Sequence, residues 1–350
     1  MTGEVRVGVI GTGIGVAHIE ALRQVPGATI VAVCSARAAR AAEVAARFAI
    51  PCAMDDYREL LAAEIDAVVI ATPPPLHAPI GLAAIAAGKH VLCEKPLAAT
   101  LGEAHALRDA ARAAGVVHML NHQQRFASAN ARAKELVAAG YIGALALADA
   151  YFALNPLDYL RAPVASTSKA GWFTDAAQGG GMLAGSAGPH LVDLLLWYGG
   201  PIAEVAARSA VTRPTILLAD DTAAVDITAE DTFVILARYV AGGLATIRGI
   251  PVAYHGGSTA VALHGVGGSL DVGYGWLRGA TSADQSLTDL PLPAESSSDR
   301  IALAARFIEA VRAGESAPAP NFDDGVRVQA VLDASVMAAR TGSWVAVSEV

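Results

Sequence analysis

The 350-residue chain is poor in cysteine and in aromatic residues, and it has no excess of positive charge. Cys34, Cys52 and Cys93 are too few and too scattered for a disulfide framework or a zinc cluster, and they indicate buried side chains in a reducing compartment. The 33 acidic residues outnumber the 25 basic ones, which gives a net charge of −8. Because such a field repels phosphate backbones and anionic lipids, we expect neither nucleic acid nor a membrane as partner.

The sequence also lacks an unbroken apolar segment of membrane-spanning length. Residues 67–88 contain no Asp, Glu, Lys or Arg and are long enough for a transmembrane helix. Pro73, Pro74, Pro75 and Pro79 interrupt them, however, and proline removes backbone donors and clashes with the preceding helical turn. We therefore predict a strand, a loop and a helix here. The N-terminal segment does not have the pattern of a signal peptide, so we expect a cytoplasmic protein.

What the sequence does have is a large apolar fraction, 54% of its residues, beside 17% charged residues. The mean hydropathy is +0.43. This composition is typical of a folded globular protein and unlike that of a disordered chain. A length of 350 residues predicts one large or two medium domains.

The first 120 residues alternate short apolar runs with longer segments of helical character. This βαβ rhythm predicts a parallel sheet that is buried under helices on both faces. The predicted strands are Val5–Ile10, Ile30–Cys34, Ala67–Ala71, His90–Cys93 and Val116–Leu120. The predicted helices cover residues 17–25, 37–49, 56–63, 77–87 and 100–113.

The pattern changes after about residue 122, and the second half is predicted to be α+β with antiparallel pairing. Residues 203–275 have the pattern of strands, and Phe233–Tyr239 and Leu244–Pro251 flank a glycine turn typical of a hairpin. Residues 153–181 form a long irregular stretch, a feature that is usually functional. The other predicted elements are a helix over 128–139, a polar surface loop over 276–298, and helices over 299–313 and 323–341.

A glycine-rich loop, Gly11-Thr12-Gly13-Ile14-Gly15, follows the first predicted strand and opens a helix. Glycines at this place let the backbone turn tightly and approach a pyrophosphate, which binds at the positive helix N-terminus. The second strand ends near Ser35, about where such sites contact the ribose. Val16 stands where the motif has its third glycine, so the match is imperfect. The βαβ context nevertheless predicts a dinucleotide-binding site.

Two further motifs follow strands of the same predicted sheet. Ala71-Thr72-Pro73-Pro74, with His77 after it, ends one strand, and Cys93-Glu94-Lys95-Pro96 ends the next. Pro96 disfavours a helical conformation at Lys95, so both charged side chains are expected at the rim of the sheet. Ligands of open parallel sheets bind at these carboxyl ends.

In combination, these three motifs resemble the Gfo/Idh/MocA family of oxidoreductases. The resemblance extends over residues 5–347. Its later matches are the junction Asn121–Phe126, the turn Gly140–Gly143, the run Gly179–Gly181 followed by Gly188–Asp193, the segment Gly265–Leu270, and the C-terminal helix from Asp324 to Gly342.

The resemblance implies an N-terminal Rossmann domain over residues 1–122, with a doubly wound parallel sheet that holds NAD or NADP. It also implies an α+β domain over residues 123–350, with a large open and mainly antiparallel sheet that binds substrate and makes oligomer contacts. The substrate would be a sugar, cyclitol or related polyol between the two domains. A homodimer or homotetramer is therefore expected, because exposed apolar sheet faces are usually buried by a partner subunit.

Carried over to this sequence, the family's catalytic residues are Lys95 and His190. Lys95 would bind the reacting oxygen as a positive donor, and His190 would be the acid/base partner, a role that histidine can fill near neutral pH. The predicted cofactor-binding residues are Gly11, Gly13, Ile14, Gly15, Ser35, Arg37, Arg40, Ala71, Thr72, Pro73, His77, Glu94, Lys95 and Gln123. The predicted substrate-binding residues are Lys95, Asn121, Arg125, Tyr159, Trp172, Ser186, His190 and Asp193.

The active-site segment departs from the family in one respect. Many members have an aspartate four residues before the active-site histidine, where this chain has Ser186. Either Lys95 and His190 suffice, or another acid such as Asp158 or Asp175 contributes. His190 and Asp193 are too few ligands for zinc, so no metal is expected.

Ser35 stands where NAD enzymes commonly have an acidic residue, and Arg37 and Arg40 follow it. Arginine binds a 2′-phosphate by charge-assisted hydrogen bonds, so NADP is favoured over NAD. Two other functions remain open at this point: an NAD-dependent glycosidase of the same fold, and a non-catalytic regulator that binds a dinucleotide or a sugar.

Overall fold

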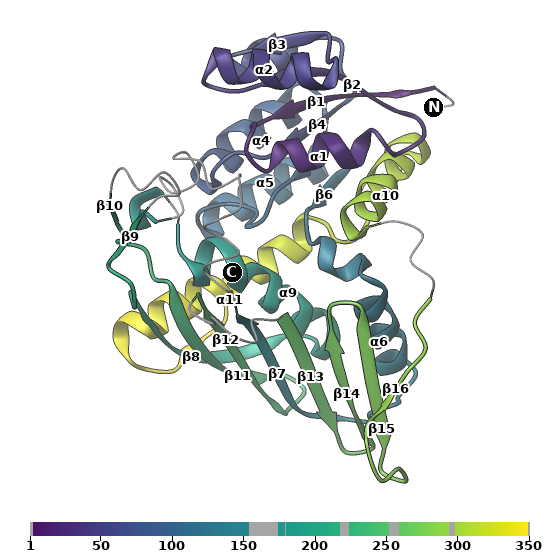
Figure 1. Ribbon diagram of the computed structural model, residues 1–350, viewed down its shortest axis with the longest axis vertical. Helices are drawn as coiled ribbons and strands as arrows, with labels where there is room; N and C mark the ends of the chain where they lie inside the picture. Colours follow the sequence, from purple (N-terminus) through teal and green to yellow (C-terminus); the bar gives the residue numbers. More distant parts are fainter. Residues whose placement is uncertain are drawn as a thin grey trace. The chain divides into compact units, whose positions relative to one another are not determined.

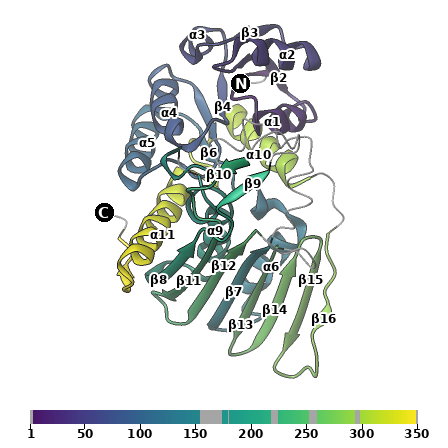
Figure 2. The same ribbon diagram turned by 60° about the vertical axis from the view of Figure 1, so that its left-hand side comes forward.

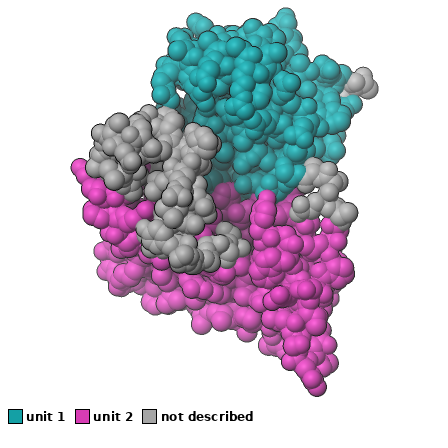
Figure 3. All heavy atoms as spheres, viewed as in Figure 1, with its two compact units in different colours: residues 1–123, 297–329 teal, residues 124–296, 330–350 magenta. Residues whose placement is uncertain are grey.

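The computed structural model describes residues 3–153, 174–178, 180–217, 224–251, 259–293 and 298–348. The chain divides into two compact units (Figure 3). Residues 1–123 and 297–329 form unit 1, and residues 124–296 and 330–350 form unit 2.

Unit 1 contains a six-stranded sheet in the order β3-β2-β1-β4-β5-β6, in which every neighbouring pair is parallel. The order reverses between β1 and β4, which are direct neighbours in the sheet. The strands are Val5–Ile10 (β1), Ala28–Cys34 (β2), Cys52–Met54 (β3), Ala67–Ile70 (β4), His90–Cys93 (β5) and His118–Leu120 (β6). These runs are apolar throughout because helices bury both faces of the central strands. The predicted doubly wound sheet is confirmed, although the sequence did not indicate the short edge strand β3.

Helices cover the two faces of this sheet in separate groups. Helix α4 packs on α5, and α1 packs on α10, and Figure 2 shows the two pairs on opposite sides of the strands. The helices are Gly15–Leu22 (α1), Ala38–Phe48 (α2), Tyr57–Ala62 (α3), His77–Ala86 (α4), Leu101–Ala114 (α5) and Asp299–Ala313 (α10). A short 3₁₀ turn, η1 (Pro74–Leu76), precedes α4.

Unit 1 includes residues from the C-terminal third of the chain, which the predicted division at residue 122 had placed in the second domain. Phe322 and Val326, in the first turns of α11 (Phe322–Thr341), belong to the same apolar core as Ile70 and Leu120. The backbone also joins them, because the Leu120 N–H donates to the Pro320 carbonyl. Residues 297–329 therefore extend the first unit rather than the second.

Unit 2 is built on a mixed, mostly antiparallel sheet that has nine strands in the described part of the chain. Their order is β16-β15-β14-β13-β7-β12-β11-β8-β17, and the pair β12–β7 is parallel. The strands are Leu145–Ala153 (β7), Ile202–Ala210 (β8), Thr232–Tyr239 (β11), Leu244–Ile250 (β12), Thr259–Gly265 (β13), Gly268–Gly273 (β14), Trp276–Thr281 (β15), Thr288–Asp289 (β16) and Val345–Ala346 (β17). Strands β9 (Thr215–Leu217) and β10 (Ala224–Asp226) pair separately. The predicted α+β fold of the second half is confirmed (Figure 1).

One face of the large sheet packs on helices, and side chains alternate between buried and exposed along its strands. Helices α6 (Ser128–Ala138) and α9 (Ala187–Gly199) contact the sheet and each other. In β11, Phe233 and Ile235 are buried, whereas Val234 and Leu236 on the opposite face are 46% and 47% exposed. This two-residue period is typical of a sheet with one uncovered face.

The prediction of a polar surface loop over residues 276–298 was wrong for its first part. Residues Trp276–Thr281 form β15, which pairs with β14 along its whole length. Leu277 is 1% exposed and its neighbours Trp276 and Arg278 point to the other face, so this stretch has the alternation of a half-buried strand. The sequence conceals that alternation because the buried side carries Gly279, whereas the outer side carries the apolar Trp276 and Ala280.

No helix in the described part of the chain is long and apolar enough to cross a membrane.

A pH dependence of stability follows from the way α11 begins against β6. The Phe322 N–H donates to Nδ1 of His118 at 3.3 Å, and the two rings lie 4.8 Å apart. Burial, with a contribution from Arg112, lowers the pKa of His118 from 6.5 to about 4, although Asp323 opposes this shift. Because the folded pKa lies below the unfolded one, the unfolded chain binds more protons between these values, and stability falls as the pH drops from about 6.5 to about 4.

We expect His118→Asn to weaken this acid destabilisation. Asparagine keeps an acceptor for the Phe322 N–H but does not titrate. Between pH 7 and pH 4.5 the wild-type protein is expected to lose roughly 2–3 kcal/mol more unfolding free energy than the variant. Urea unfolding followed by far-UV circular dichroism at both pH values measures this difference. Equal losses in the two proteins would contradict the assignment to His118.

Candidate functional site

The glycine-rich loop lies at the carboxyl end of β1, beside the end of β4. Gly11 has φ +107°, and a Cβ atom there would lie 2.2 Å from the carbonyl oxygen of Ala71, so only glycine fits. Gly13 is exposed, with open space where its side chain would be. Gly15 is buried between Val9 and Ala71. The loop thus passes close to β4 on one side and presents bare backbone on the other.

The N-terminus of α1 follows directly from this loop. Its N-cap residue, Ile14, makes no side-chain capping hydrogen bond, and the first turn carries no acidic residue. The positive end of the helix dipole is therefore neither capped nor neutralised by a side chain. An exposed glycine backbone and an uncapped helix N-terminus at the point where the strand order reverses fit the pyrophosphate of a dinucleotide.

The residues predicted to determine the preference for NAD or NADP lie at the end of β2 and just after it. Ser35 directly follows β2, and its hydroxyl oxygen lies 3.2 Å from the Thr12 hydroxyl oxygen in the glycine loop. Arg37 is exposed at the N-cap of α2, and its backbone N–H lies 3.4 Å from the Ser35 hydroxyl oxygen. Arg40 forms an ion pair with Glu43 at 2.5 Å on the surface of α2. The structure thus brings Ser35 to the glycine loop and the backbone of Arg37 to Ser35, whereas Arg40 already has an acidic partner.

The loop after β4 is tied to the loop after β5 through His77. The ring of His77 is fully buried, with Nδ1 2.8 Å from the Pro96 carbonyl oxygen and Nε2 2.8 Å from the Thr72 carbonyl oxygen. Burial lowers the pKa of His77, while the two carbonyls and Glu94 oppose that shift. Both ring nitrogens face backbone oxygens, so His77 holds the two loops together rather than facing a ligand. Ala71, Thr72 and Pro73 lie in the first of these loops.

Glu94 and Lys95 follow β5 at the same edge of the sheet. The carboxylate of Glu94 is buried and accepts hydrogen bonds from His18 Nε2 at 2.9 Å and from Asn121 Nδ2 at 2.6 Å. Arg300 Nη1 lies 3.5 Å from the same carboxylate. Lys95 is half-buried, and burial lowers the pKa of its amine while Glu94 raises it. Sequence reasoning had assigned no role to His18 or to Arg300.

Asn121 and Gln123 close unit 1 at the end of β6. The Asn121 backbone N–H donates to the Cys93 carbonyl at 2.8 Å, and its side chain donates to Glu94. The boundary between the two units falls after Gln123, inside the predicted junction motif. Asn121, predicted to bind substrate, thus directs its amide nitrogen to Glu94.

In unit 2, Arg125 and Asp193 bind each other. Arg125 Nη2 and Nε donate to the two carboxylate oxygens of Asp193 at 2.6 and 3.0 Å, and both side chains are buried. The guanidinium also lies over the ring of Trp197, 5.5 Å from its centroid. This bidentate pair fastens the short 3₁₀ turn η2 (Gln123–Phe126) to α9. Both residues had been predicted to bind substrate. In the structure they pair with each other and hold the helix that carries His190.

A π-helix, η4 (Met182–Ser186), leads directly into α9. The backbone N–H groups of Leu183 and Ala184 donate to Glu230 Oε1 at 3.0 and 3.3 Å, and burial raises the pKa of Glu230. Such wide turns are frequent at functional sites. Ser186 ends the π-helix and His190 lies one turn into α9, and both are half-buried. Tyr159 and Trp172, also predicted to bind substrate, lie outside the described residues.

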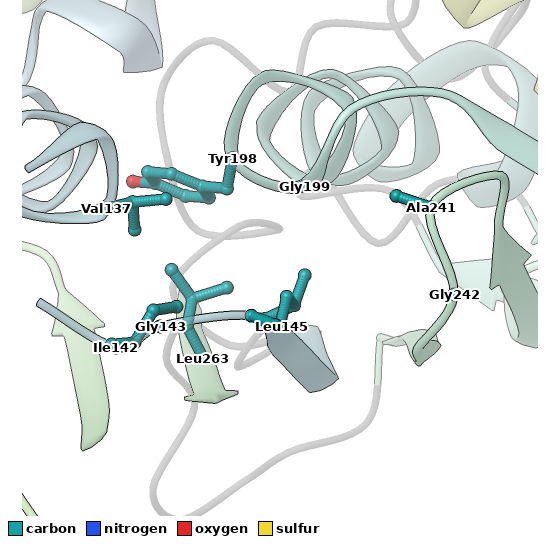
Figure 4. A pocket seen from close by; sticks show the side chains of 10 residues that line it. Val137, Ile142, Gly143, Leu145, Tyr198, Gly199, Ala241, Gly242 and Leu263 are labelled. Atoms are coloured by element: carbon teal, nitrogen blue, oxygen red, sulfur yellow. The ribbon is translucent and has the colours of Figure 1, made fainter. Parts of the chain in front are cut away.

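An apolar cavity of about 230 Å³ lies elsewhere in unit 2, near the C-terminal end of α9 (Figure 4). Val137, Ile142, Leu145, Tyr198 and Leu263 supply its side chains. None of the residues predicted to act on substrate lines it. Within the ranges that the structure describes, no group of three or more His, Cys, Asp or Glu side chains is arranged to hold a metal ion.

The fold and the glycine site together define a dinucleotide-binding protein, and comparison with known proteins assigns it to a family of oxidoreductases. Residues 5–122 match the model of the oxidoreductase family with an NAD-binding Rossmann fold, and residues 130–271 match the GFO/IDH/MocA C-terminal domain. The chain belongs to the GFO/IDH/MocA oxidoreductase family. The resemblance inferred from its motifs is therefore confirmed.

Similar proteins match along nearly the whole chain. An uncharacterised oxidoreductase of Synechocystis is 31% identical, over 98% of this chain and 96% of its own length. The 1,5-anhydro-D-fructose reductase of Ensifer adhaerens is 30% identical, over 90% of each chain. The structure of a levoglucosan dehydrogenase in complex with NADH and levoglucosan superposes with a TM-score of 0.87 at 27% identity, covering 98% of this chain and 99% of that one.

Proposed function

We propose that this protein transfers hydride between NAD(P) and a sugar, cyclitol or related polyol or keto compound. The observation that carries the proposal is the carboxyl edge of the unit 1 sheet, where an open glycine loop follows β1 and the Glu94-Lys95 pair follows β5, on either side of β4. Similarity to a levoglucosan dehydrogenase and to a 1,5-anhydro-D-fructose reductase supports a carbohydrate-like substrate. In this proposal unit 1 binds the cofactor, and unit 2 binds substrate and makes subunit contacts.

Each proposed catalytic residue has a chemical task that its side chain can perform. Bound nicotinamide would accept or supply the hydride. The Lys95 ammonium donates a hydrogen bond to the reacting oxygen, whose negative charge grows as its proton leaves. His190 takes that proton in oxidation and returns it in reduction. Ser186 ends the π-helix one turn before His190 and contributes a hydroxyl to the same site, where other members of the family have a carboxylate.

The cofactor site would use mainly backbone. Gly13 and Ile14 present N–H groups at the start of α1 to the pyrophosphate, and Ser35 with Arg37 meets the adenosine ribose. The loops that His77 joins line the nicotinamide end. The remaining substrate contacts would come from Tyr159 and Trp172, while Asn121, Arg125 and Asp193 support the site through their bonds to Glu94 and to each other.

A single set of assays separates this function from its rivals. Purified protein is incubated with each cofactor and a panel of anhydrosugars, inositols, aldoses and keto sugars. A net change in the absorbance of reduced nicotinamide supports the proposal. Release of sugar from a glycoside without net change of the cofactor identifies a glycosidase. Tight cofactor binding without turnover of any compound indicates a regulator.

Preference for NADP over NAD is the first specific expectation. Strand β2 is followed by Ser35 rather than by an acidic residue, and the exposed Arg37 two residues later can bind a 2′-phosphate. We expect NADPH to bind more tightly than NADH in a fluorescence titration, and Arg37→Ala to weaken NADPH alone. NADH binding that is about tenfold tighter or more would reverse the assignment.

Loss of either catalytic residue is expected to act on turnover. Lys95→Ala is expected to lower kcat by about a hundredfold or more while cofactor binding changes little. His190→Ala is expected to lower kcat by roughly 100- to 10,000-fold and to flatten the pH dependence near neutrality. Because both serve one proton transfer, the double variant is expected to lose far less than the product of the single losses.

A purely structural role for His190 makes a different prediction. In that case His190→Gln would lower the melting temperature while leaving turnover per folded molecule within about threefold of wild type. Parallel measurements of Tm and kcat on this variant decide between the two roles.

Assembly into a dimer or tetramer is expected from the uncovered sheet face of unit 2. Val234, Leu236, Leu244 and Ile250 are between 40% and 53% exposed on β11 and β12. Exposed apolar residues grouped on a sheet are typical of subunit contacts. Light scattering at micromolar concentration is expected to give a multiple of 35.6 kDa. Leu236→Glu is expected to shift the protein toward monomers, and a wild-type monomer would refute the expectation.

A further inference from the structure

Glu94 is a buried carboxylate on which several elements of unit 1 converge. It is 5% exposed at the end of β5. His18 reaches it from α1, Asn121 from the end of β6, and Arg300 from the first turn of α10. His18 and Asn121 are each 1% exposed. A charge removed from water in this way persists only where partners compensate for the lost hydration.

The two oxygens of the Glu94 carboxylate have different partners. Oε1 accepts hydrogen bonds from His18 and Asn121 and lies 3.5 Å from Arg300 Nη1. Oε2 accepts the backbone N–H of Lys95 at 3.1 Å. One oxygen is therefore anchored by three distant segments of the chain, while the other holds the backbone of the next residue. The carboxylate thereby links these three segments to the backbone of Lys95.

The same groups set the charge around the Lys95 amine. Within the described part of unit 1, Glu94 and Arg300 act on the amine directly, and the amine in turn acts on His77 of α4. His18 of α1 acts on Glu94. Burial lowers the pKa of Lys95, Glu94 raises it, and Arg300 lowers it further. Burial by itself would raise the pKa of Glu94, but His18, Lys95 and Arg300 bring it below its usual value. Glu94 and Arg300 thus act on Lys95 in opposite directions.

We propose that His18 and Arg300 are positioning residues of this enzyme, which hold the Glu94 carboxylate and so fix the backbone and the charge environment of Lys95. The proposal rests on the catalytic role proposed for Lys95. Neither residue is assigned to substrate or cofactor. Both residues meet the Glu94 carboxylate, and Arg300 also repels the Lys95 amine directly, from a helix some 200 residues away in sequence.

The electrostatic part is tested by direct titration of Lys95, without use of activity. The chain contains only four lysines, so a lysine-selective ¹³C label gives few NMR signals, and Lys95→Arg identifies the one from Lys95. Arg300→Met removes a like charge and is expected to raise the Lys95 pKa by about 0.5 or more, whereas Glu94→Gln is expected to lower it.

Two control variants of α10 accompany this titration. Arg300→Lys keeps the positive charge and is expected to leave the Lys95 pKa near its wild-type value. Arg306→Met removes an arginine of the same helix that pairs with Glu315 on the surface, and it is expected to change nothing. Shifts in opposite directions for Arg300→Met and Glu94→Gln support the proposal. Unchanged or equal shifts overturn it.

The mechanical part is tested at the Lys95 backbone amide in protein labelled with ¹⁵N-lysine. His18→Leu removes the hydrogen bond to Oε1, and it is expected to increase hydrogen exchange of the Lys95 amide by about tenfold or more. His18→Gln places an amide N–H near the position of Nε2 and is expected to restore protection. Equal exchange rates in wild type and His18→Leu would refute this positioning role.

Activity measurements keep this proposal separate from the proposed function. If Lys95 is the donor, the alkaline limb of the kcat/KM profile is expected to move with the Lys95 pKa in Arg300→Met and in Glu94→Gln. A Lys95 pKa that moves while the activity profile does not would count against Lys95 as the donor, and the positioning network would stand. An unmoved Lys95 pKa refutes the network even if Lys95→Ala is inactive.

Discussion

The carboxylate of Glu94, buried at the carboxyl edge of a parallel sheet, constrains much of unit 1 around it. A carboxylate in that position is stable only with hydrogen-bond donors and positive charge around it, because burial removes its hydration by water. The chain supplies them from α1, from the end of β6 and from α10. Removing one partner would leave a buried charge without compensation, so these elements are held together by one electrostatic requirement as well as by their apolar contacts.

Unit 2 meets a similar requirement with a different pair. Arg125 and Asp193 satisfy each other through two parallel hydrogen bonds and join the start of the unit to α9. Glu230, just before β11, accepts hydrogen bonds from the backbone of the π-helix that precedes α9. In each unit a buried carboxylate therefore fixes a segment that carries a proposed catalytic residue, Lys95 in unit 1 and His190 in unit 2. A rigid supporting layer of this kind is what precise proton transfer needs.

The uncovered face of the large sheet is indicated by the two-residue alternation of buried and exposed side chains along its strands. Alternation along β11 and β12 buries one row of side chains under helices and leaves the other outside. The outer row mixes apolar residues with ion pairs such as Arg248–Asp149 at 2.9 Å and Arg238–Glu204 at 2.7 Å. Such a surface combines apolar area with charges in defined positions, as is common where subunits recognise one another.

Local sequence determined the strands of unit 1 other than β3, the glycine loop, and the hairpin of β11 and β12. Buried parallel strands, tight turns and helix starts each depend on residues that are close in the chain. It also placed Lys95 and His190 in recognisable motifs. It did not indicate that β15 continues the second sheet, since that strand has glycine on its buried side and apolar Trp276 on its outer side. Nor did it indicate that residues 297–329 join the first unit. Local sequence also did not indicate the partners of Glu94. Arg300 meets Glu94 only because α10 packs against α1, and a contact between residues so distant in sequence depends on the packing of the whole unit.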